Sequence, residues 1–531
     1  MRRWISRGLV PLATAGLLIL WTQCGTTPGV PKEQACRRVE RLPRIHPDYT
    51  GIVIPPNIAP LNFCIDETGT EYCVRVSSRV GKPVVVYTNT PAIQFPLLAW
   101  RALLDANRGH SAQIAIYARR EDGSWSQFEV ITNQIAPENI DSYLAYRLME
   151  PWYMKYRSMG IFQRNLTNFE ESPIIDTKHM GRGCVNCHSF VQNRPETMTI
   201  QVRFPFAMLV CGESGVTAFD TRTEFNKGPF AYTSWHPNGR LGAFSVNKIL
   251  QVYHTAGEET RDIVDFASDL VVYDLGTNLV NTSPAISRRD RLETFPAWSP
   301  DGRFLYFCSG PPMPTENYNR HEEIRYDLMR ISYDPDTGAW GEHETLLRAG
   351  KTGLSASMPR VSPDGCFVVV CMSRYNTFPI FQGDTDLYMY DVEKGTCTPL
   401  ACNSDRTESW HGWASNGRWI VFSSKRRDGL FARPYFSYVD TEGKAAKAFV
   451  LPQEDPTLYD SWAKTYSVPE LITGPVRTRM RHIIGAIRAE DERHNVRLDP
   501  AVQLPTSASP ESPTDTEPEE GAWPTVKTQG I

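Results

Sequence analysis

A single Cys-x-x-Cys-His lies in the stretch GRGCVNCHSF, residues 181–190. On a helical turn, the thiols of Cys184 and Cys187 would face the same side, and His188 follows them directly. Covalent c-type haem needs this combination, because two thioether bonds hold the porphyrin and the histidine binds its iron. We therefore expect haem c on Cys184 and Cys187, with His188 as the proximal ligand of the iron.

Two other sites use the same pair of cysteines. Zinc is one, because Cys-x-x-Cys is half of many tetrahedral sites. A second pair at ligand spacing would then be needed, but Cys366/Cys371 and Cys397/Cys402 each have four intervening residues. A thioredoxin-like redox site is the other, and it would need a βαβ context that the surrounding pattern does not show.

The iron would also need a ligand on the side opposite to His188, unless that coordination position is open. Methionine or histidine is the usual second ligand in electron-transfer cytochromes. Met198 lies 10 residues after His188, beyond Pro195, where a strand is expected to begin. At ~3.3 Å per extended residue, this length of chain can pass around a haem edge. We expect Met198 as the distal ligand; His236, Met358 and an open coordination position are the alternatives.

The chain opens with MRRWISRGLVPLATAGLLILWTQCGTTPG. Positive residues precede an apolar core from Leu9 to Trp21, and this core is shorter than a typical transmembrane helix. Residues 1–24 resemble a bacterial lipoprotein signal in which Cys24 is lipidated. An ordinary cleaved signal and an anchor helix are the alternatives. All three predict an exported protein of the cell envelope, which is the compartment in which c-type haem is attached.

The composition agrees with a folded, exported chain. Its 531 residues are 41% hydrophobic and 22% charged, which is enough for two or three domains. The net charge of −4 gives no sign of a nucleic-acid partner. The cysteines without an assigned role are odd in number, and one or two disulfides are plausible among them in an oxidising compartment.

A turn motif recurs four times between residues 234 and 424. Each copy has Pro or Ser, then Asp or Asn, then Gly, followed by an apolar strand-like run. The copies are SWHPNGRLGAFS (234–245), AWSPDGRFLYFCS (297–309), RVSPDGCFVVVCMS (360–373) and GWASNGRWIVFSS (412–424). Asp, Asn and Gly accept the positive φ of tight hairpins. We expect Asp301, Asp364, Trp298 and Trp413 to be turn and packing residues, with no catalytic role.

A few strands repeated every 50–60 residues predict a propeller or an array, since one such sheet cannot cover both its faces. These residues resemble the TolB-like β-propeller family, whose blades carry a Ser-Pro-Asp-Gly turn before a hydrophobic strand. The resemblance covers roughly residues 198–474 and implies five or six blades. With the signal and the haem motif, the whole chain resembles propeller lipoproteins of the Bacteroidetes type that carry a single c-type haem.

The remaining segments complete the expected domain organisation, which is mainly β. Residues 25–49 are expected to be a linker, and 50–135 a small α+β or sandwich-like domain. Helix-spaced apolar residues predict a helical haem-binding segment over 136–197. Residues 475–531 are expected to hold a helix-like stretch and a disordered acidic tail.

These features favour an exported, membrane-anchored monohaem cytochrome. We expect it to act in electron transfer with a redox partner protein or a membrane electron-transfer chain. The alternative is a propeller that binds a protein or a glycan, with haem in a structural or sensing role. No Gly-x-Ser-x-Gly elbow and no recognisable triad is present, so an enzyme is not expected.

Overall fold

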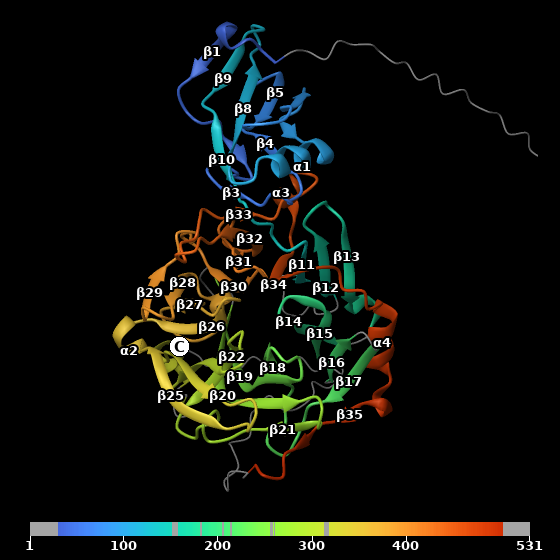
Figure 1. The fold of residues 1–531 in the computed structure, drawn as a ribbon, viewed down its shortest axis with the longest axis vertical. Helices are drawn as coiled ribbons and strands as arrows, with labels where there is room; N and C mark the ends of the chain where they lie inside the picture. The colour runs from blue at the N-terminus through green and yellow to red at the C-terminus, as the bar shows by residue number, and fades with distance from the viewer. Residues whose placement is uncertain are drawn as a thin grey trace, which may run out of the picture.

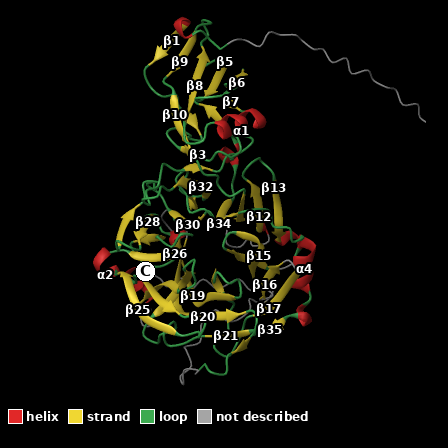
Figure 2. Ribbon diagram, in the orientation of Figure 1, coloured by secondary structure: helices red, strands yellow, loops and turns green. Residues whose placement is uncertain are grey.

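Two β-rich parts make up the computed structural model, which describes residues 30–150, 158–180, 183–203, 207–212, 215–254, 259, 261–312 and 318–502. The lipidation candidate Cys24 and the C-terminal tail lie outside these residues. Strands dominate both parts, and the helices are few and short (Figure 2). Among the described residues, no helix is long and apolar enough to cross a bilayer.

The N-terminal part is a separate domain that stands beside the larger ring of sheets (Figure 1). Its main sheet has the order β1-β9-β8-β10-β3, and β5 and β6 extend it from β8. The strands are β1 (Cys36–Val39), β3 (Val53–Ile54), β5 (Glu71–Ser77), β6 (Val84–Thr88), β8 (Ser111–Arg119), β9 (Trp125–Phe128) and β10 (Ile131–Ile135). A small second sheet and one helix complete it: β2 (Ile45–His46), β4 (Phe63–Ile65), β7 (Ala92–Ile93) and α1 (Leu97–Ala106).

The expected α+β domain is therefore present, but it begins earlier than predicted. Strands β1 and β2 fall inside the segment 25–49 that the sequence suggested as a linker. β1 pairs in parallel with β9 over its whole length, and β2 pairs with β4. Their partners lie later in the chain, so composition alone did not indicate these short strands.

The larger part is a six-bladed β-propeller, because six sheets of four or five strands follow one another around an axis. Blade 1 comprises β34 (Thr465–Ile472), β11 (Tyr143–Met149), β12 (Gly160–Asn165) and β13 (Glu171–Asp176). Blade 2 comprises β14 (Cys184–Val191), β15 (Arg194–Arg203), β16 (Ala207–Gly212), β17 (Gly215–Asp220) and β35 (His494–Asn495). Blade 3 comprises β18 (Ala231–Trp235), β19 (Leu241–Tyr253), β20 (Arg261–Asp274), β21 (Leu279–Asn281) and β36 (Arg497–Leu498).

Blades 4 to 6 have four strands each. Blade 4 comprises β22 (Leu292–Trp298), β23 (Phe304–Gly310), β24 (Asp327–Tyr333) and β25 (Trp340–Leu347). Blade 5 comprises β26 (Ser355–Val361), β27 (Phe367–Ser373), β28 (Asp386–Asp391) and β29 (Thr396–Pro399). Blade 6 comprises β30 (Glu408–Trp413), β31 (Trp419–Ser424), β32 (Arg433–Tyr438) and β33 (Phe449–Val450). The short helices are α2 (Ala349–Thr352), α3 (Leu458–Ser461) and α4 (Met480–Arg488).

The C-terminal region closes the ring and then wraps around its outside. β34 supplies the innermost strand of blade 1 by pairing antiparallel with β11. Beyond it, α4 buries Ile483 and Ile487 in the apolar cluster of blades 1 and 2. β35 and β36 then add in parallel to the outer edges of blades 2 and 3 (Figure 1). The helix-like stretch expected after residue 475 is thus confirmed as α4, with two edge strands after it.

The recurrent motif forms the turn between the first two strands of blades 3 to 6, as predicted. Its glycines all have positive φ, from +67° at Gly417 to +75° at Gly365. In blade 4 the Asp301 carboxylate accepts hydrogen bonds from the Ser299 hydroxyl and the Arg303 N–H, at 2.5 and 3.0 Å. These residues are turn residues and need no further role.

The helical segment predicted over 136–197 is wrong. Its described residues form β11, β12, β13, β14 and the start of β15, so the propeller begins at Tyr143 rather than at Met198. Leu144, Ala145 and Tyr146 are all buried, because β11 lies between β12 and β34 and packs on both faces. A strand buried on both faces has no clean alternation, so its apolar residues resembled a helical pattern.

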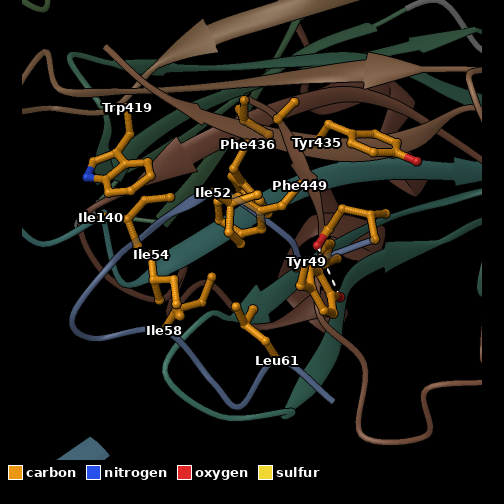
Figure 3. Packing of buried hydrophobic residues seen from close by; sticks show 14 of the residues in the cluster. Tyr49, Ile52, Ile54, Ile58, Leu61, Ile140, Trp419, Tyr435, Phe436 and Phe449 are labelled. Atoms are coloured by element: carbon orange, nitrogen blue, oxygen red, sulfur yellow. Dashed lines mark hydrogen bonds between the residues drawn. The ribbon is translucent and has the colours of Figure 1, made fainter. Parts of the chain in front are cut away.

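The N-terminal domain packs on blade 6 through a continuous apolar core. Figure 3 shows Tyr49, Ile52 and Ile54 of the domain beside Phe436 and Phe449 of the blade. The Tyr49 hydroxyl donates to the carbonyl of Val450 at 3.4 Å. The domain is therefore held on the outer strands of the last blade, away from the inner strand β14.

Candidate functional site around the propeller axis

Cys184, Cys187 and His188 lie on β14, the innermost strand of blade 2. The strand pairs with β15, and its register shifts between Val185 and His188. Adjacent residues of an extended strand point to opposite faces. Asn186 and Cys187 lie within this irregularity, where simple alternation is interrupted, and the helical turn expected for the motif is not found because these residues are in a strand.

His188 is buried between blades 1 and 2. Its side chain is 0% exposed, and Nε2 lies 3.9 Å from Oε2 of Glu470 on β34. Neither ring nitrogen has a hydrogen-bond partner of ordinary geometry among the described residues, although a contact with the backbone of Ala145 acts to raise the pKa of the ring. Burial, reinforced by the charge of Arg147, lowers the pKa of His188 to about 3. The imidazole is therefore neutral at physiological pH, which is the form that binds metals.

The two cysteines of the motif are free thiols, and each is partly exposed. Burial raises the pKa of Cys184, although Arg203 and Arg147 oppose this effect. None of the eleven cysteines in the described part forms a disulfide, so the expected one or two disulfides are absent there. The described residues also contain no group of three His, Cys, Asp or Glu that could hold a metal.

These residues fit a c-type haem in their chemistry. A buried neutral histidine with both nitrogens unpartnered suits an axial ligand, because a buried polar atom normally has a partner. Two free thiols on the same strand could form the thioether bonds. The extended backbone differs from the expected helical turn, so all three side chains can reach one ring only if residues 184–187 leave this strand geometry.

Met198 does not occupy the position of a distal ligand in this structure. It pairs with Phe190, two residues beyond His188, and is 0% exposed within the apolar cluster between blades 1 and 2. Because His188 pairs with Ile200, both side chains leave the sheet on the same face. In this structure Met198 packs within the apolar cluster and is a packing residue.

The two alternative ligands differ in their surroundings. His236 lies in the first turn of blade 3, where Nε2 hydrogen-bonds the Gly302 carbonyl at 3.2 Å and Nδ1 accepts the Asn238 N–H at 3.2 Å. Both its nitrogens are therefore in use. Met358, by contrast, lies on β26 at a φ of +53° and lines the same axial cavity as His188.

This axial cavity, with a volume of about 460 Å³, lies inside the ring of inner strands. Each inner strand has a register shift, and β14 has a second one between Phe190 and Val191; the residue directly after the first shift along the strand lines the cavity in every blade. In chain order around the ring, starting from blade 2, these residues are His188, Ser234, Ala297, Arg360, Gly412 and Glu470. A larger but more open hollow of about 800 Å³ lies at the outer edge of the propeller near Thr223 and Leu498, away from the motif.

The three ionisable side chains of this ring, those of His188, Arg360 and Glu470, are not evenly spaced around the axis. Glu470 neighbours His188, since β34 and β14 are adjacent inner strands. Arg360, on β26, lies three blades from His188 and therefore on the opposite side of the axis. Burial raises the pKa of Glu470 to about 7, against the Phe190 N–H that it accepts at 3.1 Å and the charge of Arg360.

The sequence interpretation missed Arg360 and Glu470. A signal for Arg360 was present, because it stands two residues before the Ser-Pro-Asp-Gly turn of its blade. Ser234, Ala297 and Gly412 stand at the same distance before their turns. Aligning the four turns would have identified one inward position per blade. Glu470 had no such signal, since blade 1 lacks the turn motif.

No protein-family model matches the chain, and comparison with curated proteins gives no match. Solved propeller structures do resemble it. The Dos1 propeller is 13% identical, with 51% of this chain and 63% of that chain covered and a TM-score of 0.32. An oligogalacturonate lyase from Vibrio parahaemolyticus is 12% identical, with 56% and 92% covered and a TM-score of 0.32. The tricorn protease is 12% identical, with 80% and 36% covered and a TM-score of 0.32. These are likenesses of fold only, and the strand order described above defines the propeller.

Proposed function

We propose that this protein is an exported β-propeller cytochrome that carries one haem c and acts in electron transfer. The observation that carries this proposal is His188, a buried, neutral histidine without a hydrogen-bond partner, which follows directly after two free thiols. Cys184 and Cys187 would bind the haem covalently, and His188 would bind its iron. The haem would supply one-electron exchange with a redox partner protein or a membrane electron-transfer chain.

Residues around the motif would hold His188 in position and form the surroundings of the haem. Arg147 donates to Asn186 Oδ1 at 2.9 Å and to Ser467 Oγ at 3.3 Å, which ties the motif strand to β34. Glu470 accepts the Phe190 N–H and limits the movement of the strand after His188. Such outer contacts orient a metal-binding histidine and tune the metal that it holds.

Covalent haem is tested by producing the full chain with the c-type maturation machinery. We expect a haem-stained band after denaturing electrophoresis and a pyridine haemochrome spectrum of the c type. Replacing both motif cysteines (Cys184→Ala with Cys187→Ala) should remove the stain. Cys366→Ala, at an exposed free thiol, is the matched control and should keep it. Protein that contains zinc and no covalent haem would refute the proposal.

Electron transfer itself requires a reversible one-electron couple at a protein-film electrode.

A second candidate function is favoured by the axial cavity, whose tryptophan-rich lining suits a ligand. In that case the propeller binds a protein or a glycan, and the haem is structural or sensory. Haem-containing protein that shows tight ligand binding but no couple would favour this second function.

A further inference from the structure

The guanidinium of Arg360 lines the axial cavity and interacts electrostatically with Glu470 without forming an ion pair with it. Its Nη1 donates to the carbonyl of the preceding Pro359, at 3.1 Å. No carboxylate among the described residues forms an ion pair with it. Two other cations of this propeller are paired with carboxylates: Lys425 with Glu259 at 2.6 Å, and Arg426 with Glu408 at 3.0 Å. Arg360 is half-buried at the cavity wall, and removing a charge from water is costly unless it is paired, so a cation in this position favours an anionic partner from outside the chain.

The neighbours of Arg360 in the ring leave this cation accessible from the cavity. Ala297 precedes it and Gly412 follows it, and these are the two smallest side chains of the six. Glu470 lies beyond Gly412, but its carboxylate is directed to blade 2, where it accepts the Phe190 N–H. The nearest acid is therefore engaged with another strand, and the space beside Arg360 is free of side chains from the flanking positions.

The cavity also has walls and a size suited to a small molecule. Trp410 and Trp413 of β30 line it next to Arg360, and the unpartnered ring of His188 lines the opposite side. The volume of about 460 Å³ is within the usual range for small-molecule sites. At roughly 30 Å³ per water molecule, it corresponds to a ligand of roughly fifteen non-hydrogen atoms.

We propose that the axial cavity binds a small organic acid whose carboxylate pairs with Arg360. Guanidinium and carboxylate groups form two parallel charge-assisted hydrogen bonds, and these are stronger than neutral ones. The body of the acid packs against Trp410 and Trp413. A haem held at His188 would bring propionate carboxylates of the same chemistry, so the experiment separates a free acid from a haem propionate.

The first arm uses the full chain produced without haem maturation, with galacturonate and succinate as probes and galactose and succinamide as their neutral counterparts. Isothermal titration calorimetry should show binding of the acids and not of the neutral compounds. Arg360→Gln should weaken binding at least tenfold. Arg348→Gln, at an exposed arginine in the connection between blades 4 and 5, should leave it unchanged. If neither acid binds, or if Arg360→Gln binds them equally well, the proposal is overturned.

A second variant covers the case in which Arg360→Gln does not fold. A Cβ at Gly412 would meet only the Pro469 carbonyl, at 3.6 Å, which is ordinary contact. Gly412→Val should therefore fold with unchanged circular dichroism and block the space beside Arg360. Binding that survives in this folded variant contradicts the assigned position.

The second arm repeats the titration on haem-loaded protein. Binding in both forms assigns Arg360 to a free acid. Binding only in the haem-free form assigns Arg360 to a haem propionate, and Arg360→Gln should then shift the Soret band of the loaded protein. The first titration needs no haem, so its failure would not affect the result of the haem-stain test. A failed haem-stain test would likewise not affect the titration of haem-free protein.

Discussion

Nε2 of His188 lies 3.9 Å from Oε2 of Glu470, although one residue belongs to the second blade and the other to the last strand of the ring. The same carboxylate accepts the N–H of Phe190 at 3.1 Å. The strand that closes the propeller therefore also completes the surroundings of the Cys-x-x-Cys-His motif. Closure of the fold and formation of the candidate site depend on the same pairing of β34.

Removal of β34 should prevent folding of the whole propeller. A chain that ends at Ala463 lacks the inner strand of blade 1 and leaves β11 as an unpaired edge inside the ring. We expect aggregated protein without a cooperative thermal transition. A chain that ends at Val502 keeps every described strand and helix and is the control. A monomeric shorter chain with the control's melting temperature would contradict closure by β34.

Met198 should behave as a core residue. Met198→Ala would leave a cavity in a closely packed apolar cluster, and we expect a loss of about 2–5 kcal/mol in the free energy of unfolding. Met198→Leu conserves volume and should cost less than about 1.5 kcal/mol. The haem spectrum of the Leu variant should match that of the wild type.

Absorption spectra near the sulfur–iron charge-transfer band check this expectation. Loss of that band in Met198→Leu would restore Met198 as the distal ligand. Met358→Leu is the informative comparison, because Met358 lines the cavity shared with His188. A band that disappears only in Met358→Leu would assign the ligand to blade 5.

Asp265 should make stability depend on pH. It is buried on β20, accepts a hydrogen bond from Asn247 at 2.8 Å, and burial raises its pKa to about 6. Because this pKa lies above the unfolded value, the contribution is full below about pH 4 and is lost as pH rises through 6. The loss amounts to about 3 kcal/mol by pH 7.

Urea unfolding of the wild type and of Asp265→Asn at pH 4 and pH 7 measures this contribution of Asp265 to the free energy of unfolding. The variant should lose less stability than the wild type between the two values, since asparagine does not ionise. Parallel pH profiles for the two proteins would show that Asp265 titrates normally in the folded state.

Cys24 should anchor the protein, although it lies outside the described residues. We expect Cys24→Ser to move the protein from the membrane fraction to the soluble fraction of the envelope, because a lipidated cysteine would be the anchor. Cys36→Ser, in strand β1 of the folded domain, should stay with the membranes. If Cys24→Ser also stays there, the anchor is elsewhere in the chain.

Local chemistry made several features predictable. Asp or Asn followed by Gly specifies a tight turn with positive φ, and the glycines at 239, 302, 365 and 417 have this conformation. Four such turns before apolar runs were enough to indicate a propeller, because each sheet needs a neighbour to cover its faces. The strand-like segments in 50–135, with a helix-like stretch between them, likewise indicated the N-terminal domain, whose strands pair mostly within that range.

The other features of the fold and the site depended on pairing between strands that are far apart in the sequence. The apolar run around Tyr143 fitted a helix by its spacing, but it became a strand because β34 lies alongside it at the end of the chain. Strand preference depends on packing and neighbours more than on the residues themselves, so local spacing could not settle this point. The sequence by itself determined the cysteines, the histidine and the turns. Only the closed ring determined that His188 and Glu470 are neighbours and that Arg360 faces them across the axis, because residues from six blades converge on that axis.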